Sequence, residues 1–174
     1  MSSELRLTPT SYIVLGLLDA AGEATPYDLK QAVGISLGNF WSLPHAQLYA
    51  EPERLEAAGL LSERREKGGR RRRHYKLTPA GRRALRTWLA EPTEELTELR
   101  DLSMLKIFFG ADPKALAAVQ LPARLERIAS YEETVARIEG QVPRGIILAL
   151  RAGIAHEQEW ARFFTRLQAG EEEA

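Results

Sequence analysis

Residues 60–81 read LLSERREKGGRRRRHYKLTPAG, and they give the clearest indication of how the chain folds. Two extended-looking runs flank Gly68-Gly69, and a Gly-Gly pair between such runs is typical of a two-residue β-hairpin turn. Tyr75 and Leu77 are two positions apart in the second run, so both side chains face one side of a strand, towards a core. The stretch therefore predicts a two-stranded hairpin with one buried face.

On either side of the hairpin, three helices are expected to begin in the same way, with threonine as N-cap and proline at the first helical position. The pairs are Thr8-Pro9, Thr25-Pro26 and Thr78-Pro79. Another helix is expected from Ser42, with Pro44 in its first turn, to Gly59. Three helices, a hairpin and a further helix form the layout of a winged helix-turn-helix; a generic small α+β domain is the alternative.

The hairpin concentrates positive charge in a chain whose formal net charge is zero. Residues 64–76 contain eight Lys or Arg side chains, and residues 1–91 contain 14 Lys or Arg against 10 Asp or Glu. Arginines held close together repel one another, and a polyanion such as DNA would relieve that repulsion. A solvated edge strand that avoids pairing is the alternative, but lysine mixed with glutamate would be usual there.

These features predict a DNA-binding surface on two elements, a recognition helix at about 43–58 and a basic wing at about 60–77. In a helix-turn-helix, the start of the third helix meets base edges in the major groove. The alternative for the helix residues is that Tyr49 is half-buried and the others are ordinary surface residues. The predicted DNA-binding residues are His45, Gln47, Tyr49, Lys67, Arg70, Arg71, Arg72 and Arg73.

The second half of the chain is expected to be entirely helical. Helices are predicted at about 96–109, from Asp112-Pro113 with a break at Pro122, and at about 143–169. The last two should form an antiparallel hairpin whose apolar stripes need a partner. The simplest partner is a second copy of the chain, in a two-fold dimer. The alternative is that the hairpin folds back on its own domain. The predicted dimerisation residues are Leu121, Leu125, Ile128, Val135, Ile138, Ile147, Leu150 and Ile154.

Several classes of protein are excluded by what the sequence lacks. It has no cysteine, which excludes disulfides and thiolate chemistry and favours a cytoplasmic location. It shows no signal peptide, no membrane span, no phosphate-binding glycine loop and no metal-ligand spacing, so we expect no enzyme activity, cofactor or metal. His156-Glu157 is expected to lie on a solvated helix face. The remaining rival is a winged-helix module that binds protein or RNA.

Four motifs in order, VLGLL, FWSLPHAQLY, RLEAAGLL and GRRRRHYKLTPAGRRALRTWL, resemble the PadR family of bacterial transcriptional regulators over about residues 10–91. The helical half resembles the C-terminal domain of the two-domain, virulence-activator-like members. The resemblance implies a homodimeric repressor or activator that binds a double-stranded DNA operator, with the third helix in the major groove. The chain departs from the family pattern at Pro44 and Ala46, where serine and glycine are usual, and at Pro52 inside the third helix.

The expected architecture is thus a mainly α protein with two domains. Residues 1–91 form the winged helix-turn-helix DNA-binding domain, and residues 92–174 form an all-α dimerisation domain that would also hold an effector. A regulator needs a switch, and a small apolar or aromatic ligand bound among aromatic side chains could supply one. Ordinary core packing is the alternative for these side chains. The predicted effector residues are Met104, Phe108, Phe109, Trp160 and Phe163.

Overall fold

The chain divides into two compact units, Met1–Glu95 and Leu96–Ala174, each of which is described here by itself. No described helix is both long and apolar enough to span a lipid bilayer. The computed structural model describes residues 6–36, 41, 43–66, 68 and 71–171.

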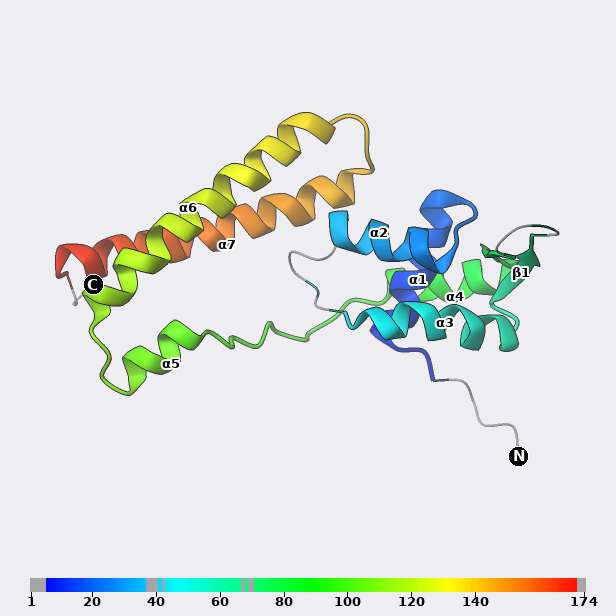
Figure 1. Ribbon diagram of the computed structural model, residues 1–174, viewed down its shortest axis with the longest axis horizontal. Helices are drawn as coiled ribbons and strands as arrows, with labels where there is room; N and C mark the ends of the chain where they lie inside the picture. The colour runs from blue at the N-terminus through cyan, green and yellow to red at the C-terminus, as the bar shows by residue number, and fades with distance from the viewer. Residues whose placement is uncertain (1–5, 37–40, 42, 67, 69–70, 172–174) are drawn as a thin grey trace. The chain divides into compact units, whose positions relative to one another are not determined.

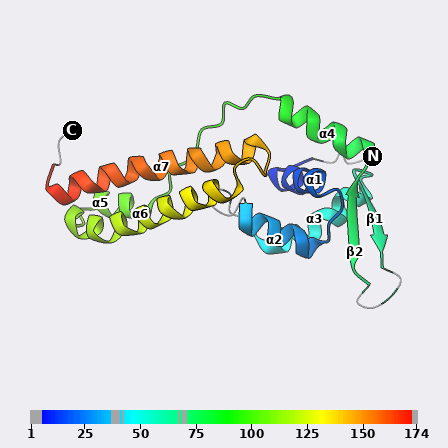
Figure 2. The ribbon, with the colours of Figure 1, turned by 90° about the horizontal axis from the view of Figure 1, so that it is seen from above.

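The described part of the first unit is built from helices and one two-stranded antiparallel sheet (Figure 1, Figure 2). The element order confirms the predicted winged helix-turn-helix, with β1 and β2 as the wing. The elements are α1 (Pro9–Ala21), α2 (Pro26–Ser36), α3 (His45–Ala57), β1 (Leu61–Arg65), β2 (Arg73–Leu77) and α4 (Pro79–Ala90).

The threonine-proline starts of α1, α2 and α4 are confirmed. The Thr8 hydroxyl accepts a hydrogen bond from the backbone N–H of Ser11, and Thr78 caps α4 in the same way. At α2, the Asp28 carboxylate accepts from both the backbone N–H and the hydroxyl of Thr25, at 2.9 and 2.7 Å. These bonds satisfy amides that the first turn of a helix leaves without partners.

The wing strands pair from Leu61 opposite Leu77 to Arg65 opposite Arg73. The predicted two-residue Gly-Gly turn is wrong, because residues 66–72 connect the strands. Arg65 and Arg73 face one another at the last pair of the ladder, and beyond them the Glu66 N–H still donates to the Arg72 carbonyl at 3.1 Å. Of the three consecutive arginines that the structure describes, Arg71 to Arg73, only Arg73 lies in a strand.

Tyr75 joins the wing to the helices of the first unit. It forms an isolated antiparallel bridge with Ala24, whose N–H and C=O bond to the Tyr75 backbone at 3.1 and 2.9 Å. Tyr75 and Leu77 are 0% and 4% exposed, which confirms that they share the buried face. The core around them is formed by Val14, Leu15, Leu18, Ala24, Leu29, Val33, Leu48, Leu55, Leu61 and Leu85.

Gly81, in the first turn of α4, lies against the end of the α3–β1 connection. A Cβ atom added there would lie 2.2 Å from the Leu60 carbonyl oxygen. We expect Gly81→Ala to lower the free energy of unfolding by about 1–3 kcal/mol, the usual range for overpacking. Gly16→Ala is the control, since a Cβ on Gly16 in α1 meets nothing within 4 Å, and alanine should stabilise that helix by about 0.5–1 kcal/mol. Urea denaturation followed by circular dichroism measures the free energy of unfolding of both variants. Equal changes in the two would contradict a close contact between residue 81 and the Leu60 carbonyl.

The third helix is one continuous helix that begins at His45. Pro44 is its N-cap and not part of its first turn, and the predicted start at Ser42 lies outside the described residues. Proline inside a helix removes one hydrogen bond and crowds the carbonyl four residues earlier, which costs about 3 kcal/mol. Pro52 nevertheless does not split α3. Its ring is fully buried, as is Leu48, and this apolar burial offsets part of the cost.

The second unit consists of a short helix, α5 (Leu102–Phe108), and two long ones, α6 (Pro113–Ile138) and α7 (Arg144–Ala169). The long helices lie side by side and antiparallel in both views (Figure 1, Figure 2). Their connection includes Gly140 at a φ of 82°, a conformation that favours glycine. This confirms the predicted helical hairpin.

Two predicted features of the second unit are wrong. Residues 96–101 are not helical, because Leu96 and Leu99 are 90% and 59% exposed and have no core to support a helix there. Asp101 caps α5 instead. Pro122 does not break α6; it is exposed, as is Ala118 one turn earlier, so water can satisfy the carbonyl that loses its partner.

Candidate nucleic-acid interface

The beginning of α3 presents polar side chains to solvent. Gln47 is exposed, and its Oε1 accepts a hydrogen bond from the Thr10 hydroxyl of α1 at 3.0 Å. Tyr49 is 46% exposed, so its ring is accessible to a partner. The side chain of His45 lies outside what the structure describes. Gln47 can pair with adenine in the major groove, with its amide N–H donating to N7 and its Oε1 accepting from the N6 amino group, and Tyr49 can donate to a phosphate.

Arg71 and Arg72 occupy the connection beyond the last paired residues of the wing, and both are exposed. No described residue forms an ion pair with either side chain. Arg71 has a φ of 47°, in the left-handed region, so the backbone turns sharply there. Lys67 and Arg70, also predicted to bind DNA, lie outside the described residues.

The paired part of the wing is charged differently, because glutamates neutralise its arginines. Arg64 bonds to Glu23 in the α1–α2 connection, and Arg65 bonds to Glu63 in its own strand. Arg73 bonds to Glu53 in α3 and lies 3.7 Å from Glu63, measured from Nη1 to Oε2. The Tyr75 hydroxyl also donates a hydrogen bond to Glu63, at 3.2 Å. Sequence reasoning missed Glu23 and Glu53, which are far from the wing in sequence.

His74 joins the same network on the other side of the hairpin. Its Nε2 lies 2.9 Å from Glu66 Oε1 and its Nδ1 3.3 Å from Glu23 Oε1. The His74 side chain is 21% exposed. His74 therefore ties the start of the wing connection to the α1–α2 connection, and the backbone N–H of its partner Glu66 donates to the Arg72 carbonyl at 3.1 Å.

These contacts lower the pKa values of three glutamates below their usual range. Hydrogen bonds from Arg64 to Glu23, from Arg65 to Glu63 and from His74 to Glu66 are the main causes. The depressed values mean that folding favours the ionised carboxylates. Each of them thus contributes stability above the pKa it has when unfolded, and loses that contribution as the pH falls through its folded pKa.

The winged unit should therefore be stable from neutral pH down to about pH 5 and lose stability below about pH 4.5, the region of unperturbed glutamate. Glu63→Gln should flatten this acid dependence, because it removes one of the depressed carboxylates. Glu126→Gln, at an exposed site on α6, is the control. Amide hydrogen exchange of Tyr75 as a function of pH reports on the winged unit alone. An acid profile unchanged by Glu63→Gln would contradict this account.

The residues predicted for dimerisation lie in different environments of the α6–α7 hairpin. Ile128 and Ile147 are buried within the chain itself, at 9% and 6% exposure, whereas Leu125 is 52% exposed. Leu125, Ile128 and Ala161 line an open groove of about 620 Å³, which polar side chains of α7 border. The remaining predicted residues, Leu121, Val135, Ile138, Leu150 and Ile154, are half-buried.

The predicted effector residues are only partly brought together. Met104, Trp160 and Phe163 pack round the buried core of Ala117, Phe164 and Leu167. Phe108 and Phe109 are 81% and 76% exposed and contact each other edge to face, outside this cluster. The packing of the first three corresponds to the alternative of ordinary core.

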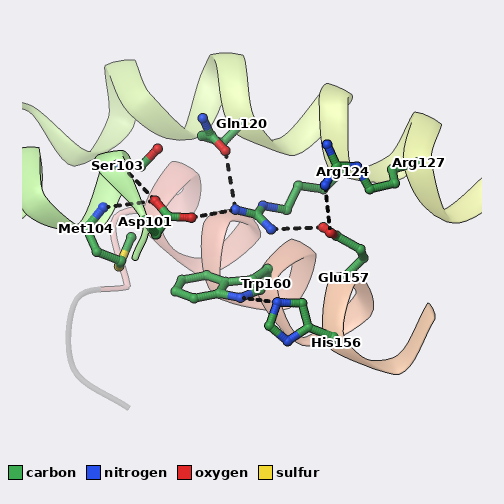
Figure 3. A network of polar contacts seen from close by, with 9 residues as sticks. All are labelled: Asp101, Ser103, Met104, Gln120, Arg124, Arg127, His156, Glu157 and Trp160. Carbon is green, nitrogen blue, oxygen red and sulfur yellow. Dashed lines mark hydrogen bonds and ion pairs between the residues drawn. The ribbon is translucent and has the colours of Figure 1, made fainter. Parts of the chain in front are cut away.

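A buried charge cluster in the second unit was not foreseen (Figure 3). Arg124 of α6 bonds to Asp101 at the start of α5 and to Glu157 of α7, both at 2.8 Å, and Glu157 also pairs with Arg127. The Arg124 guanidinium lies over the ring of Trp160, 5.0 Å from its centroid. The expectation that Glu157 lies on a solvated face is wrong, since it is 5% exposed.

Burial alone would raise the pKa of Asp101. The backbone N–H groups of Met104 and Ser103 and the charge of Arg124 outweigh it, so the pKa is lowered. The side chain is therefore an ionised cap that holds α5 to α6. In the described part of the chain, Arg124 Nε is the buried side-chain polar atom without a hydrogen-bond partner.

A winged helix-turn-helix with a basic wing, followed by a helical hairpin, defines the two-domain winged-helix transcription factors. The family model "Transcriptional regulator PadR-like family" matches residues 14–87. The negative transcriptional regulator PadR of Bacillus subtilis (strain 168) is 31% identical over 139 residues, which cover 74% of this chain and 76% of that protein. The chain belongs to the PadR-like family of transcriptional regulators, and the resemblance found in the sequence is confirmed.

Solved structures share the fold of this chain over nearly its whole length. Bacillus subtilis PadR in complex with operator DNA has a TM-score of 0.82 at 26% identity, over 93% of this chain and 98% of that one. The same protein in complex with p-coumaric acid has a TM-score of 0.77 at 24% identity, over 97% and 100%. The Vibrio cholerae virulence activator AphA has a TM-score of 0.68 at 24% identity, over 92% and 96%, and shares the fold.

Proposed function

We propose that this chain is a sequence-specific DNA-binding repressor that acts as a homodimer and has no enzymatic activity. The observation that carries the proposal is the exposed pair Arg71 and Arg72, neither of which forms an ion pair with a described residue, at the end of a wing whose other described arginines, Arg64, Arg65 and Arg73, are ion-paired. Exposed arginines without ion-pair partners attract phosphates, and arginine also suits the negative minor groove. Gln47 and Tyr49 at the start of α3 would supply contacts in the major groove. The likeness to a relative crystallised on operator DNA supports this arrangement.

Dimerisation would place two such surfaces on one operator. Two-fold related half-sites lie about one helical turn of DNA apart, and a palindromic site mirrors that symmetry. The groove beside Leu125 and Ile128 is the apolar surface that we assign to the second copy. A chain that sediments as a monomer at micromolar concentration would contradict this part of the proposal.

A small aromatic acid is the effector class that we propose, because the related Bacillus subtilis protein has been crystallised with p-coumaric acid. Trp160 reports on the aromatic cluster of the second unit, and its fluorescence would change if a ligand entered there. Titration with aromatic acids, compared with their aliphatic counterparts, tests the effector class.

The first experiment on DNA binding is a titration of the purified protein with pooled genomic fragments at two salt concentrations, followed by sequencing of the bound fraction. Enrichment of a palindromic site that survives the higher salt concentration is the expected result. Binding that is lost with salt and enriches no sequence would mean that the arginines attract nucleic acid non-specifically. A winged-helix module that binds protein or RNA would then replace the proposed function.

A further inference from the structure

The arginines of the wing fall into two groups according to their partners. Arg71 and Arg72 are exposed and have no ion-pair partner among the described residues, whereas Arg73 lies between two carboxylates. Those carboxylates come from different elements, Glu53 from α3 and Glu63 from β1. Arg73 thus contacts the recognition helix and the neighbouring wing strand at once.

The carboxylate on the wing side is firmly held. The Glu63 side chain is 14% exposed, and it also accepts a hydrogen bond from the hydroxyl of Tyr75. Tyr75 is fully buried and bridges to Ala24 through its backbone. The contact of Arg73 is therefore anchored to the core of the first unit on one side and to α3 on the other.

A planar guanidinium suits this position. It presents several N–H donors in a fixed fork and can hold two carboxylates in a defined geometry, which the single ammonium group of lysine cannot. A two-stranded hairpin is only marginally stable by itself, so its direction depends on such contacts with the rest of the domain. A change in that direction would alter the spacing between the wing and the recognition helix on DNA.

We propose that Arg73 is a positioning residue, which braces the wing against the recognition helix and does not itself neutralise a phosphate. The inference rests on the proposed function, since it concerns how the DNA-binding surface is held. The charge of Arg73 is already compensated by Glu53 and Glu63, so DNA that approaches it releases no additional counterions. Arg71 and Arg72 supply the phosphate contacts instead.

The test compares Arg73→Ala, Arg73→Lys, Glu53→Gln and the double variant Arg73→Ala/Glu53→Gln, with Arg72→Ala as the reference. The affinity of each is measured at several salt concentrations for the genomic site recovered by selection and for a scrambled duplex of the same length. Arg73→Ala should weaken binding to the selected site about 3- to 10-fold, leave the slope of log K against log salt unchanged, and weaken binding to the scrambled duplex less. Arg73→Lys should behave like Arg73→Ala, although it keeps the charge.

Glu53→Gln separates the two roles most sharply. If Arg73 braces the wing, removing its partner on α3 weakens binding to the selected site, and the double variant is no weaker than Arg73→Ala alone. If Arg73 binds phosphate, Glu53 competes with DNA, so Glu53→Gln tightens binding and Arg73→Ala lowers the salt slope by about one. That second pattern would contradict the proposed positioning role of Arg73. If Arg72→Ala also changes neither affinity nor slope, the proposed DNA-binding function fails, and the brace fails with it.

Discussion

Replacing Arg71 and Arg72 together by alanine is expected to weaken binding to every duplex, whatever its sequence. Each side chain is exposed and forms no ion pair with a described residue, and each is assigned one phosphate. A charge-assisted contact at such a site contributes about 1 kcal/mol or more, so the pair should account for roughly a 30-fold loss near 0.1 M salt. The slope of log K against log salt should become shallower by about 1.8, because each lost phosphate contact accounts for about 0.9.

The matched control is the double variant Arg83→Ala/Arg86→Ala, which removes the same charge from exposed positions on α4. Fluorescence anisotropy at several salt concentrations, with the selected site and a scrambled duplex, separates local contact from net charge. Equal losses in the two double variants would mean that only the total charge of the unit matters. A loss confined to the selected site would show that these arginines read sequence.

Glu157→Ala is expected to lower the stability of the second unit by about 3 kcal/mol. The variant leaves Arg124, whose side chain is 12% exposed, with one carboxylate fewer in an apolar setting. Breaking a buried ion pair from one side is strongly destabilising, because the charge that remains has lost its compensation. Removing every buried charge of the cluster is less damaging, so Asp101→Asn/Arg124→Met/Glu157→Leu should retain more stability than Glu157→Ala.

Glu159→Ala provides the control on the same helix. Glu159 also pairs with an arginine, Arg162, but both side chains are about two-thirds exposed, at 66% and 64%. Exposed pairs of this kind contribute less than about 1 kcal/mol. Urea unfolding monitored through Trp160 in an otherwise tryptophan-free protein reports on the second unit. If Glu157→Ala and Glu159→Ala were equally stable, the buried cluster would not be what holds α5, α6 and α7 together.

Local signals in the sequence predicted the fold of the first unit well. The threonine-proline starts, the shared parity of Tyr75 and Leu77 and the order of elements are all confirmed, because each depends on neighbours within a few residues. The Gly-Gly turn and the break at Pro122 were wrong. In the wing, the register that places Arg65 opposite Arg73 leaves an odd number of residues between the strands, which a two-residue turn cannot fit. At Pro122, the exposed helix surface lets water satisfy the carbonyl that loses its partner.

The candidate site was harder to predict, because its important contacts join distant parts of the chain. The sequence shows eight basic residues between Arg64 and Lys76, but it cannot show that Glu23 and Glu53 neutralise some of them. The cluster around Arg124 likewise draws on three helices. His156-Glu157 appeared to be a solvated pair, and only the packing of α5 and α6 against α7 makes Glu157 a buried partner.

The bridge between Ala24 and Tyr75 also bears on the order in which the protein folds. It closes a long chain loop, and the entropy lost on closing such a loop must be met before the contact forms. Helices α6 and α7, by contrast, follow one another directly, so contacts near their connecting turn, such as Arg151 with Glu139, join residues close in sequence and can form rapidly. We therefore expect the helical hairpin to be the early-folding part of the chain. The DNA-binding surface would then be assembled last, once Tyr75 has docked and the wing has its final direction.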